Sequence, residues 1–218
     1  LEFLVRKIYH HKDRKIPYND IAILCRTRGQ ANSVVDALYN AHIPVQPQYM
    51  GLFNCSGVKD IVAWCQLVSG GTFQDSALFR LIVNKCGYKI AHMIFSESNR
   101  HDTNPRLDQF KSDNYLRERY PSIDNIIKSI DRLRSNIQKR SAGEMVWEIT
   151  EQLGVLRASA KKYSMDDHYT LLNIGNLLKR AQDFTRRNKN NHSIIAFNIY
   201  LEAIMRSGGL PHIKPESY

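Results

Sequence analysis

The sequence predicts an α/β piece followed by an all-α region, with helix predominant in the chain as a whole. Up to about residue 85, helical and extended segments alternate, which is the order typical of a small parallel sheet covered by helices. Beyond that point no strand pattern is convincing, and apolar residues recur at the three- and four-residue steps of amphipathic helices. Hydrophobic residues make up 43% of the 218 residues and charged residues 24%, which is sufficient for a buried core.

The first part of the chain has the pattern of a helix, a strand, a second helix and a second strand. Residues 2–14 carry apolar side chains on one helical face, and Pro17 follows the end of this helix. The segment DIAILCR, residues 20–26, holds four consecutive apolar residues, so we expect a strand that is buried on both faces. A helix over residues 30–41 follows, and two prolines mark residues 42–49 as an edge strand. This order predicts a small parallel β-α-β unit with a right-handed crossover.

Helices alone account for the pattern in the rest of the chain. Two of them, residues 56–69 and 74–85, have apolar stripes, and Gly70 is expected to end the first. The polar segment 98–111 is expected to be a loop. Trp147 falls on an apolar helix face, so we expect it in the core. Four longer helices predict a helical bundle, namely residues 121–140, 142–154, 166–187 and 193–207.

The balance of charge favours an acidic partner. Lysine and arginine number 31 against 21 acidic residues, which gives a net charge of +10. Such a charge attracts nucleic acid through phosphate neutralisation and counterion release, although a basic surface that serves solubility alone is the alternative. Four cysteines without CxxC spacing and eight scattered histidines predict reduced thiols in a cytoplasmic protein and no metal site. The sequence has no run of about 18 apolar residues and no secretory signal, so we expect no membrane contact.

Two clusters of basic residues are candidates for contact with nucleic acid. The denser cluster lies at the end of the 166–187 helix and comprises Lys179, Arg180, Arg186, Arg187 and Lys189. It either contacts phosphates or forms a solvated helix face. In the other cluster, Arg117 and Arg119 alternate with tyrosines at positions 115 and 120. These side chains suit a backbone grip with base stacking, and the alternative is a solvated helix flank whose tyrosines pack their rings.

Two motifs follow one another in the first part of the chain. The first, residues 16–46, reads IPYNDIAILCRTRGQANSVVDALYNAHIPVQ and joins the expected strand to the helix after it. The second, residues 51–68, reads GLFNCSGVKDIVAWCQLV. In their order and spacing these motifs resemble the start of the second RecA-like motor domain in UvrD/Rep/PcrA-type helicases of superfamily one. The later helices resemble, more weakly, the helical subdomain that is inserted into that motor domain.

The resemblance implies a role for the end of the expected strand. Arg26 matches the family's arginine that reaches ATP from the opposite motor domain, where a planar guanidinium pairs with phosphate oxygens. Cys25, Thr27 and Gln30 would be its neighbours at the ATP site, with Thr27 and Gln30 shaping the turn and beginning the next helix. Cys25 stands where the family usually has an aromatic residue that stacks on adenine, and Arg28 where it usually has asparagine. The alternative is that Arg26 is a solvated arginine at the end of a strand.

The same resemblance implies that the chain is a piece of an ATP-dependent DNA helicase, which its start without methionine also favours. Residues 1–86 would belong to the second motor domain, residues 87–207 to the inserted helical subdomain, and residues 208–218 to a tail leading back to the motor domain. The whole protein would bind ATP and Mg²⁺ between this domain and the first RecA-like domain. It would move along single-stranded DNA, open duplex DNA and serve DNA repair in the cytoplasm, or at the nucleoid of a prokaryote.

Motifs for binding ATP by itself are absent from the sequence. The chain has neither a GxxxxGK[ST] phosphate loop nor an acidic metal-holding strand, so we expect this piece alone to hold no cofactor and to be inactive. Two other interpretations stay open. The main one is a non-catalytic basic helical module that binds nucleic acid or a protein partner, and the weaker one is an unrelated small α/β enzyme.

Overall fold

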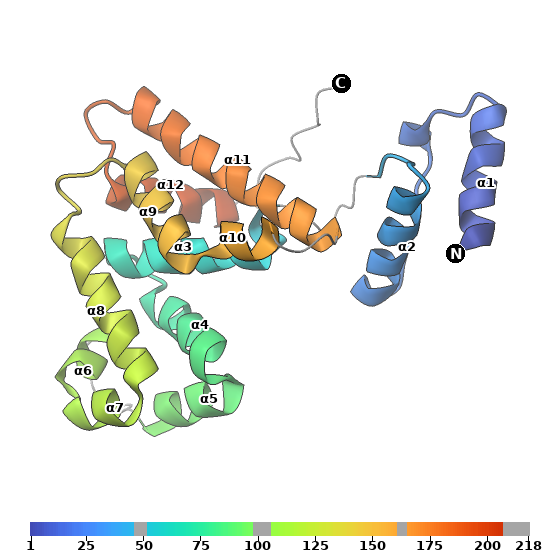
Figure 1. The fold of residues 1–218 in the computed structure, drawn as a ribbon. Helices are drawn as coiled ribbons and strands as arrows, with labels where there is room; N and C mark the ends of the chain where they lie inside the picture. Colours follow the sequence, from blue (N-terminus) through green and yellow to red (C-terminus); the bar gives the residue numbers. More distant parts are fainter. Residues whose placement is uncertain (46–51, 98–105, 161–164, 207–218) are drawn as a thin grey trace.

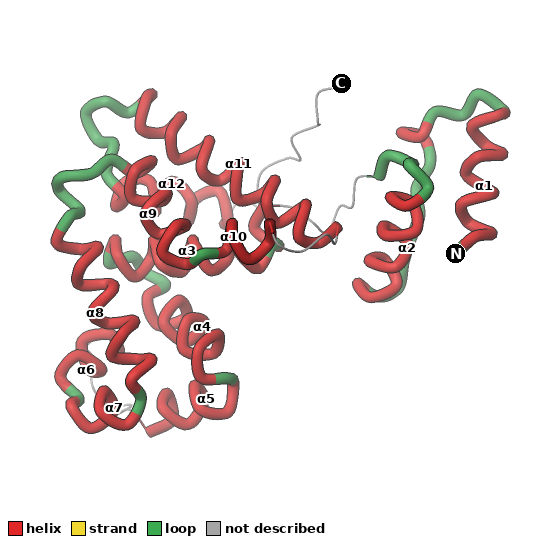
Figure 2. Tube along the Cα trace, in the orientation of Figure 1, coloured by secondary structure: helices red, strands yellow, loops and turns green. Residues whose placement is uncertain are grey.

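The computed structural model describes residues 1–45, 52–97, 106–160 and 165–206 (Figure 1, Figure 2). The first range holds α1 (Glu2–Asp13), a 3-10 turn at Tyr18–Asp20 and α2 (Arg28–Asn40). The second holds another 3-10 turn at Leu52–Asn54, α3 (Ser56–Ser69), α4 (Gln74–Cys86) and α5 (Tyr88–Glu97). The later helices are α6 (Arg106–Ser112), α7 (Asn114–Arg119), α8 (Pro121–Ser135), α9 (Ala142–Leu153), α10 (Val155–Ala160), α11 (Met165–Arg187) and α12 (Ile194–Arg206). The prediction of a predominantly helical protein is confirmed.

The expected β-α-β unit is not formed within the described residues. Residues 21–25 form an irregular segment, extended at Ile21 (φ −105°, ψ 121°), and no described strand runs beside it. A strand needs a neighbour to share its backbone hydrogen bonds, and residues 42–45 do not supply one. Leu24, expected to be buried, is therefore 96% exposed. The rest of the expected edge strand, residues 46–49, lies outside the described residues.

Two hydrophobic clusters hold the described helices together. The smaller cluster joins α1 to α2 and to the segment after it, through Ile8, Leu38 and Ile43. The larger cluster takes side chains from every helix from α3 to α12. Along the described chain the two clusters therefore divide between residue 45 and residue 52.

Helix α3 lies at the centre of the larger cluster. It is buried along almost its whole length, from Gly57 to Val68, and only Lys59 and Asp60 in this stretch are partly exposed. It contacts α4 and α8 as well as α9, α11 and α12, and Figure 1 shows it in cyan between these groups. The domain boundary expected at residue 86 stays a prediction, and it would separate α3 and α4 from helices that share their core.

Two local expectations for this region are wrong. Part of the segment expected to be a loop forms α6, which buries Leu107 and Phe110, while residues 98–105 lie outside the described residues. Trp147 is 50% exposed, because the inner face of α9 is already filled by other apolar side chains. Those side chains include Val146 and Ile149. The buried stripe of α9 therefore runs next to Trp147 and does not include it.

The ends of four helices use the left-handed backbone conformation in two different ways. Helix α3 ends at Gly70 (φ 76°), as expected, and α9 ends at Gly154 (φ 64°). Helices α1 and α2 are followed by Lys15 (φ 62°) and His42 (φ 54°), where a Cβ atom is present. Outside glycine this conformation costs about 1 kcal/mol, so these two turns carry backbone strain.

Replacing Lys15 by glycine is expected to stabilise the protein by about 1 kcal/mol, because glycine relieves the strain of the left-handed position. Urea unfolding followed by circular dichroism measures the change. The matched control is Lys7→Gly, in the exposed interior of α1, where glycine should cost about 1 kcal/mol. A loss of stability in Lys15→Gly equal to that of the control would contradict the assignment of strain.

Candidate functional site

The turn at residues 26–30 is fixed by hydrogen bonds on both sides of the helix start. Thr27 is the N-cap of α2, and its Oγ1 accepts a hydrogen bond from the backbone N–H of Gln30 at 3.3 Å. The Gln30 side chain reaches back, and its Oε1 accepts the backbone N–H of Arg26 at 3.2 Å. The prediction that Thr27 and Gln30 shape the turn and begin the helix is confirmed. Together they fix the backbone from which the Arg26 side chain projects.

The turn presents positive charge that no acidic side chain of the described residues neutralises. Arg26 is exposed and forms no ion pair with any described residue, and the first turn of α2 has no acidic residue. The helix dipole adds partial positive charge at this end of α2. Cys25 is an exposed free thiol beside it. Such a turn suits an anion such as a phosphate, which would be brought to it by another part of a larger protein.

The basic cluster at the end of α11 is only partly available for binding. Lys179, Arg187 and Lys189 are exposed and have no ion pair within the described chain. Arg186 pairs with Asp183 one turn before it. Arg180 is half-buried, and its Nε lies buried without a hydrogen-bond partner among the described residues. The structure therefore leaves three of the five expected cations open to a ligand.

Arg117 is engaged within the protein. Its Nε donates to Asp124 Oδ1 at 2.8 Å, and its guanidinium also donates to the backbone carbonyl of Lys111 at 3.2 Å. Lys128 and Arg117 hydrogen-bond the Asp124 carboxylate and hold its pKa below the ordinary value. The arginine thus ties α7 to α8 and to the end of α6.

Arg119 lies among the tyrosines with which it alternates in the sequence. Its guanidinium carbon is 5.7 Å from the ring centroid of Tyr115 and 5.6 Å from that of Tyr120. It also donates a hydrogen bond to the Tyr115 hydroxyl at 2.6 Å. These contacts engage the Arg119 guanidinium with groups of the protein itself. Tyr115 is 64% exposed, so much of its ring remains available to a ligand.

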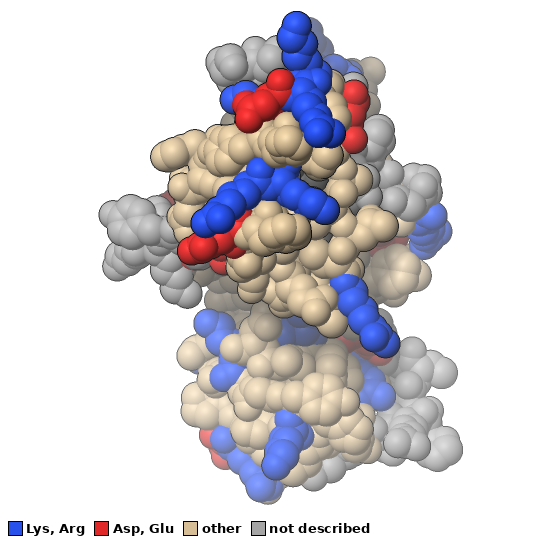
Figure 3. Space-filling model, turned by 90° about the vertical axis from the view of Figure 1, so that its right-hand side faces the viewer, with Lys and Arg blue, Asp and Glu red and all other residues tan. Residues whose placement is uncertain are grey.

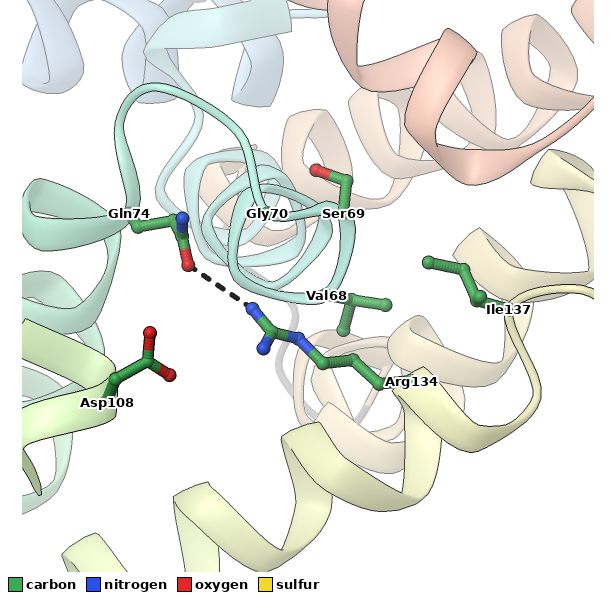
Figure 4. Close-up of a pocket in the computed structure, with 7 residues that line it drawn as sticks. All are labelled: Val68, Ser69, Gly70, Gln74, Asp108, Arg134 and Ile137. Carbon is green, nitrogen blue, oxygen red and sulfur yellow. Dashed lines mark hydrogen bonds between the residues drawn. The ribbon is translucent and has the colours of Figure 1, made fainter. Parts of the chain in front are cut away.

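A pocket of about 400 Å³ with polar and apolar walls lies at the end of α3, where no motif indicated one. Arg134 of α8 donates to the carbonyl of Leu67 at 2.7 Å and to Gln74 Oε1 at 3.2 Å. Figure 4 shows Asp108 and Arg134 pointing into the same space from opposite walls. Because Arg134 binds the Leu67 carbonyl, its guanidinium lies at the C-terminal end of α3 and opposes the negative end of the helix dipole. Its partner atoms are far away in sequence, so no local signal marks this site.

Two further properties bear on what the site can bind. No group of three or more His, Cys, Asp or Glu side chains that could hold a metal ion occurs among the residues the structure describes. Of the helices that it describes, none is long and apolar enough to cross a bilayer.

Comparison with known proteins covers nearly the whole chain. A family model described as the UvrD-like helicase C-terminal domain matches residues 1–210. No curated protein sequence matches the chain. The matched residues include both hydrophobic clusters, the turn at Arg26 and the basic end of α11.

Proposed function

Because the chain belongs to the family of UvrD-like helicase C-terminal domains, we propose that it acts as part of an ATP-dependent DNA helicase. In this proposal the complete protein couples ATP hydrolysis to movement along single-stranded DNA and to the opening of duplex DNA. ATP and Mg²⁺ are held mainly by the first RecA-like domain, which is the protein partner of this chain. A cytoplasmic location and service in DNA repair belong to the same proposal.

The turn at Arg26 is the observation that carries the proposal. Its guanidinium is exposed and unpaired within the described chain, and its backbone is fixed by Gln30. During phosphoryl transfer, negative charge spreads over the oxygens of the transferred group, and an arginine from the facing domain stabilises it. An exposed Arg26 side chain with a fixed backbone and no acidic partner among the described residues suits this stabilising role. Cys25 and Thr27 would flank the nucleotide at the same place.

The DNA-contacting role rests on the open end of α11. Lys179, Arg187 and Lys189 offer three cations that bind no acidic side chain of the described protein. They suit phosphates of single-stranded or duplex DNA, which they would contact without reading sequence. Arg180 and Arg186 border this group. Arg117 and Arg119 are engaged in hydrogen bonds within the protein, so in this proposal they add only secondary contacts with DNA.

The 218-residue chain is expected to bind a single-stranded oligonucleotide and to hydrolyse no ATP above background. Fluorescence anisotropy at increasing salt measures the binding. Replacing Lys179, Arg187 and Lys189 by alanine should weaken it and reduce the slope of log K against log salt by about 2, since each lost phosphate contact contributes roughly 0.7. The matched control removes Lys85, Lys89 and Lys139, which are also exposed. Equal effects of the two triple variants on binding would contradict the DNA contact assigned to the end of α11. ATP turnover by this chain alone would contradict the proposal that ATP is held mainly by the first RecA-like domain.

A further inference from the structure

Helix α1 exposes a row of basic side chains that the proposed function does not use. Its buried face holds Ile8, which packs against α2, so the opposite face points to solvent. At the helical period, Arg6 lies nearly opposite Ile8, and Lys7 and Arg14 lie on one flank of this outer face, which also carries the acidic Asp13. All three basic side chains are exposed. Figure 3 looks onto this side of the molecule, where lysine and arginine side chains lie over the upper half beside a few Asp and Glu side chains.

The structure gives these cations few acidic partners within the part of the chain that it describes. Lys7 and Arg14 form no ion pair with a described residue, and Arg6 approaches Glu2 only to 4.0 Å with both side chains more than four-fifths exposed. Some other basic residues sit close to carboxylates, as Arg80 does with Asp60 at 2.6 Å. A pair as open as Arg6–Glu2 is screened by water and salt. Solvent counterions therefore neutralise this face, and a polyanion would release them.

An aromatic side chain completes the row. Phe3 is 72% exposed on the same face, one turn before Lys7, whose Nζ lies 5.3 Å from the ring centroid. An exposed aromatic ring among cations is the arrangement on which single-stranded bases stack, because every base has a flat face. The helix is held in place by Ile8 in the smaller cluster and by the Tyr9 hydroxyl, which donates to the Ala41 carbonyl.

We propose that the outer face of α1, formed by Phe3, Arg6, Lys7 and Arg14, is a second binding surface for single-stranded nucleic acid. The cations contact successive phosphates, and Phe3 stacks on a base without regard to sequence. The row suits this ligand better than a membrane, because an interfacial helix needs a broad apolar face and the cations of α1 are accompanied by one exposed apolar ring, Phe3, at the first turn of the helix. The inference takes its ligand class from the proposed function and differs from it in location.

The test compares variants of the 218-residue chain for binding to a fluorescent oligothymidylate. Replacing Arg6, Lys7 and Arg14 by glutamine should weaken binding at least tenfold at low salt and lower the salt slope by about 2. Phe3→Ala should weaken binding severalfold and leave the slope unchanged, because stacking releases no counterions. The control triple variant at Lys85, Lys89 and Lys139, with glutamine in place of lysine, should bind as the parent does. Since all these positions are exposed, unfolding curves should be unchanged.

The outcomes separate this inference from the proposed contact at α11. A loss of affinity in the α1 variant supports the inference, whatever the α11 variant does. Normal binding by the α1 variant together with weak binding by the α11 variant overturns the inference and leaves the proposed function standing. Binding to anionic phosphatidylserine vesicles that depends on the α1 cations, without any effect on oligothymidylate, also overturns it. A parent chain that binds no oligothymidylate at low salt overturns the α1 and α11 contacts, while the ATP-facing role of Arg26 is tested separately by turnover.

Discussion

Replacing Arg26 by alanine in the complete helicase is expected to lower DNA-stimulated ATP turnover about 1000-fold, the lower end of the range for arginines that stabilise phosphoryl transfer. The loss should fall mainly on kcat, because the guanidinium meets charge that develops in the transition state. Steady-state hydrolysis at saturating single-stranded DNA measures the effect. Arg26→Lys should recover only part of the activity, since an ammonium lacks the planar fork that pairs with two phosphate oxygens.

Arg28→Ala provides the matched control, because it removes the same charge two residues away at a position to which the resemblance assigns no role. It should leave turnover within a fewfold of the parent enzyme. Thermal unfolding of Arg26→Ala should also be unchanged, because the side chain is exposed and no described residue pairs with it. Unchanged turnover in Arg26→Ala would show that the residue is a solvated arginine in a surface turn.

Replacing Phe197 by alanine is expected to lower the free energy of unfolding by about 3–5 kcal/mol. Phe197 is fully buried, and its ring centroid lies 5.3 Å from that of Phe184 and 5.9 Å from that of Tyr200. The change therefore removes apolar burial and aromatic contacts and leaves a cavity between α11 and α12. For a chain of this size the midpoint of thermal unfolding should fall by about 10 °C.

The control for this variant lies on the same helix. Ile199 is 64% exposed, so Ile199→Ala should change the free energy of unfolding by less than about 0.5 kcal/mol. Calorimetry or urea unfolding of both variants compares a buried and an exposed apolar residue two positions apart in α12. A loss below about 1 kcal/mol in Phe197→Ala would mean that the aromatic group around it repacks without a cavity.

Signals that depend on nearby residues predicted the helices well. Apolar residues at three- and four-residue steps indicated a helix over residues 121–140, and the structure forms α8 over Pro121–Ser135 with Ile123, Ile126 and Ile130 buried. Gly70 ends α3 in the left-handed conformation that its position indicated. In each case the physical cause acts within a few residues of the chain.

Features that depend on distant partners were not predictable in the same way. The apolar run before Arg26 has the composition of a buried strand, but a strand forms only where a second strand pairs with it. Helix α6 was missed because its two buried residues, Leu107 and Phe110, are too few to establish a period. Within the candidate site, Thr27 and Gln30 act locally and were predicted. The pairing of Arg117 with Asp124 depends on α8 and was not.

The irregular segment at residues 21–25 also bears on how the molecule should behave at high concentration. It combines β-branched and apolar residues, contains no proline, and exposes Leu24 almost completely beside backbone groups that no described strand satisfies. An apolar stretch with unpaired backbone can add a strand from another molecule, which is why natural sheets protect their edges with lysine, proline or a covering element. In the complete protein, a strand paired with residues 21–25 would thus cover these backbone groups and limit aggregation, in addition to its structural role. The same residues that place Arg26 would otherwise direct self-association.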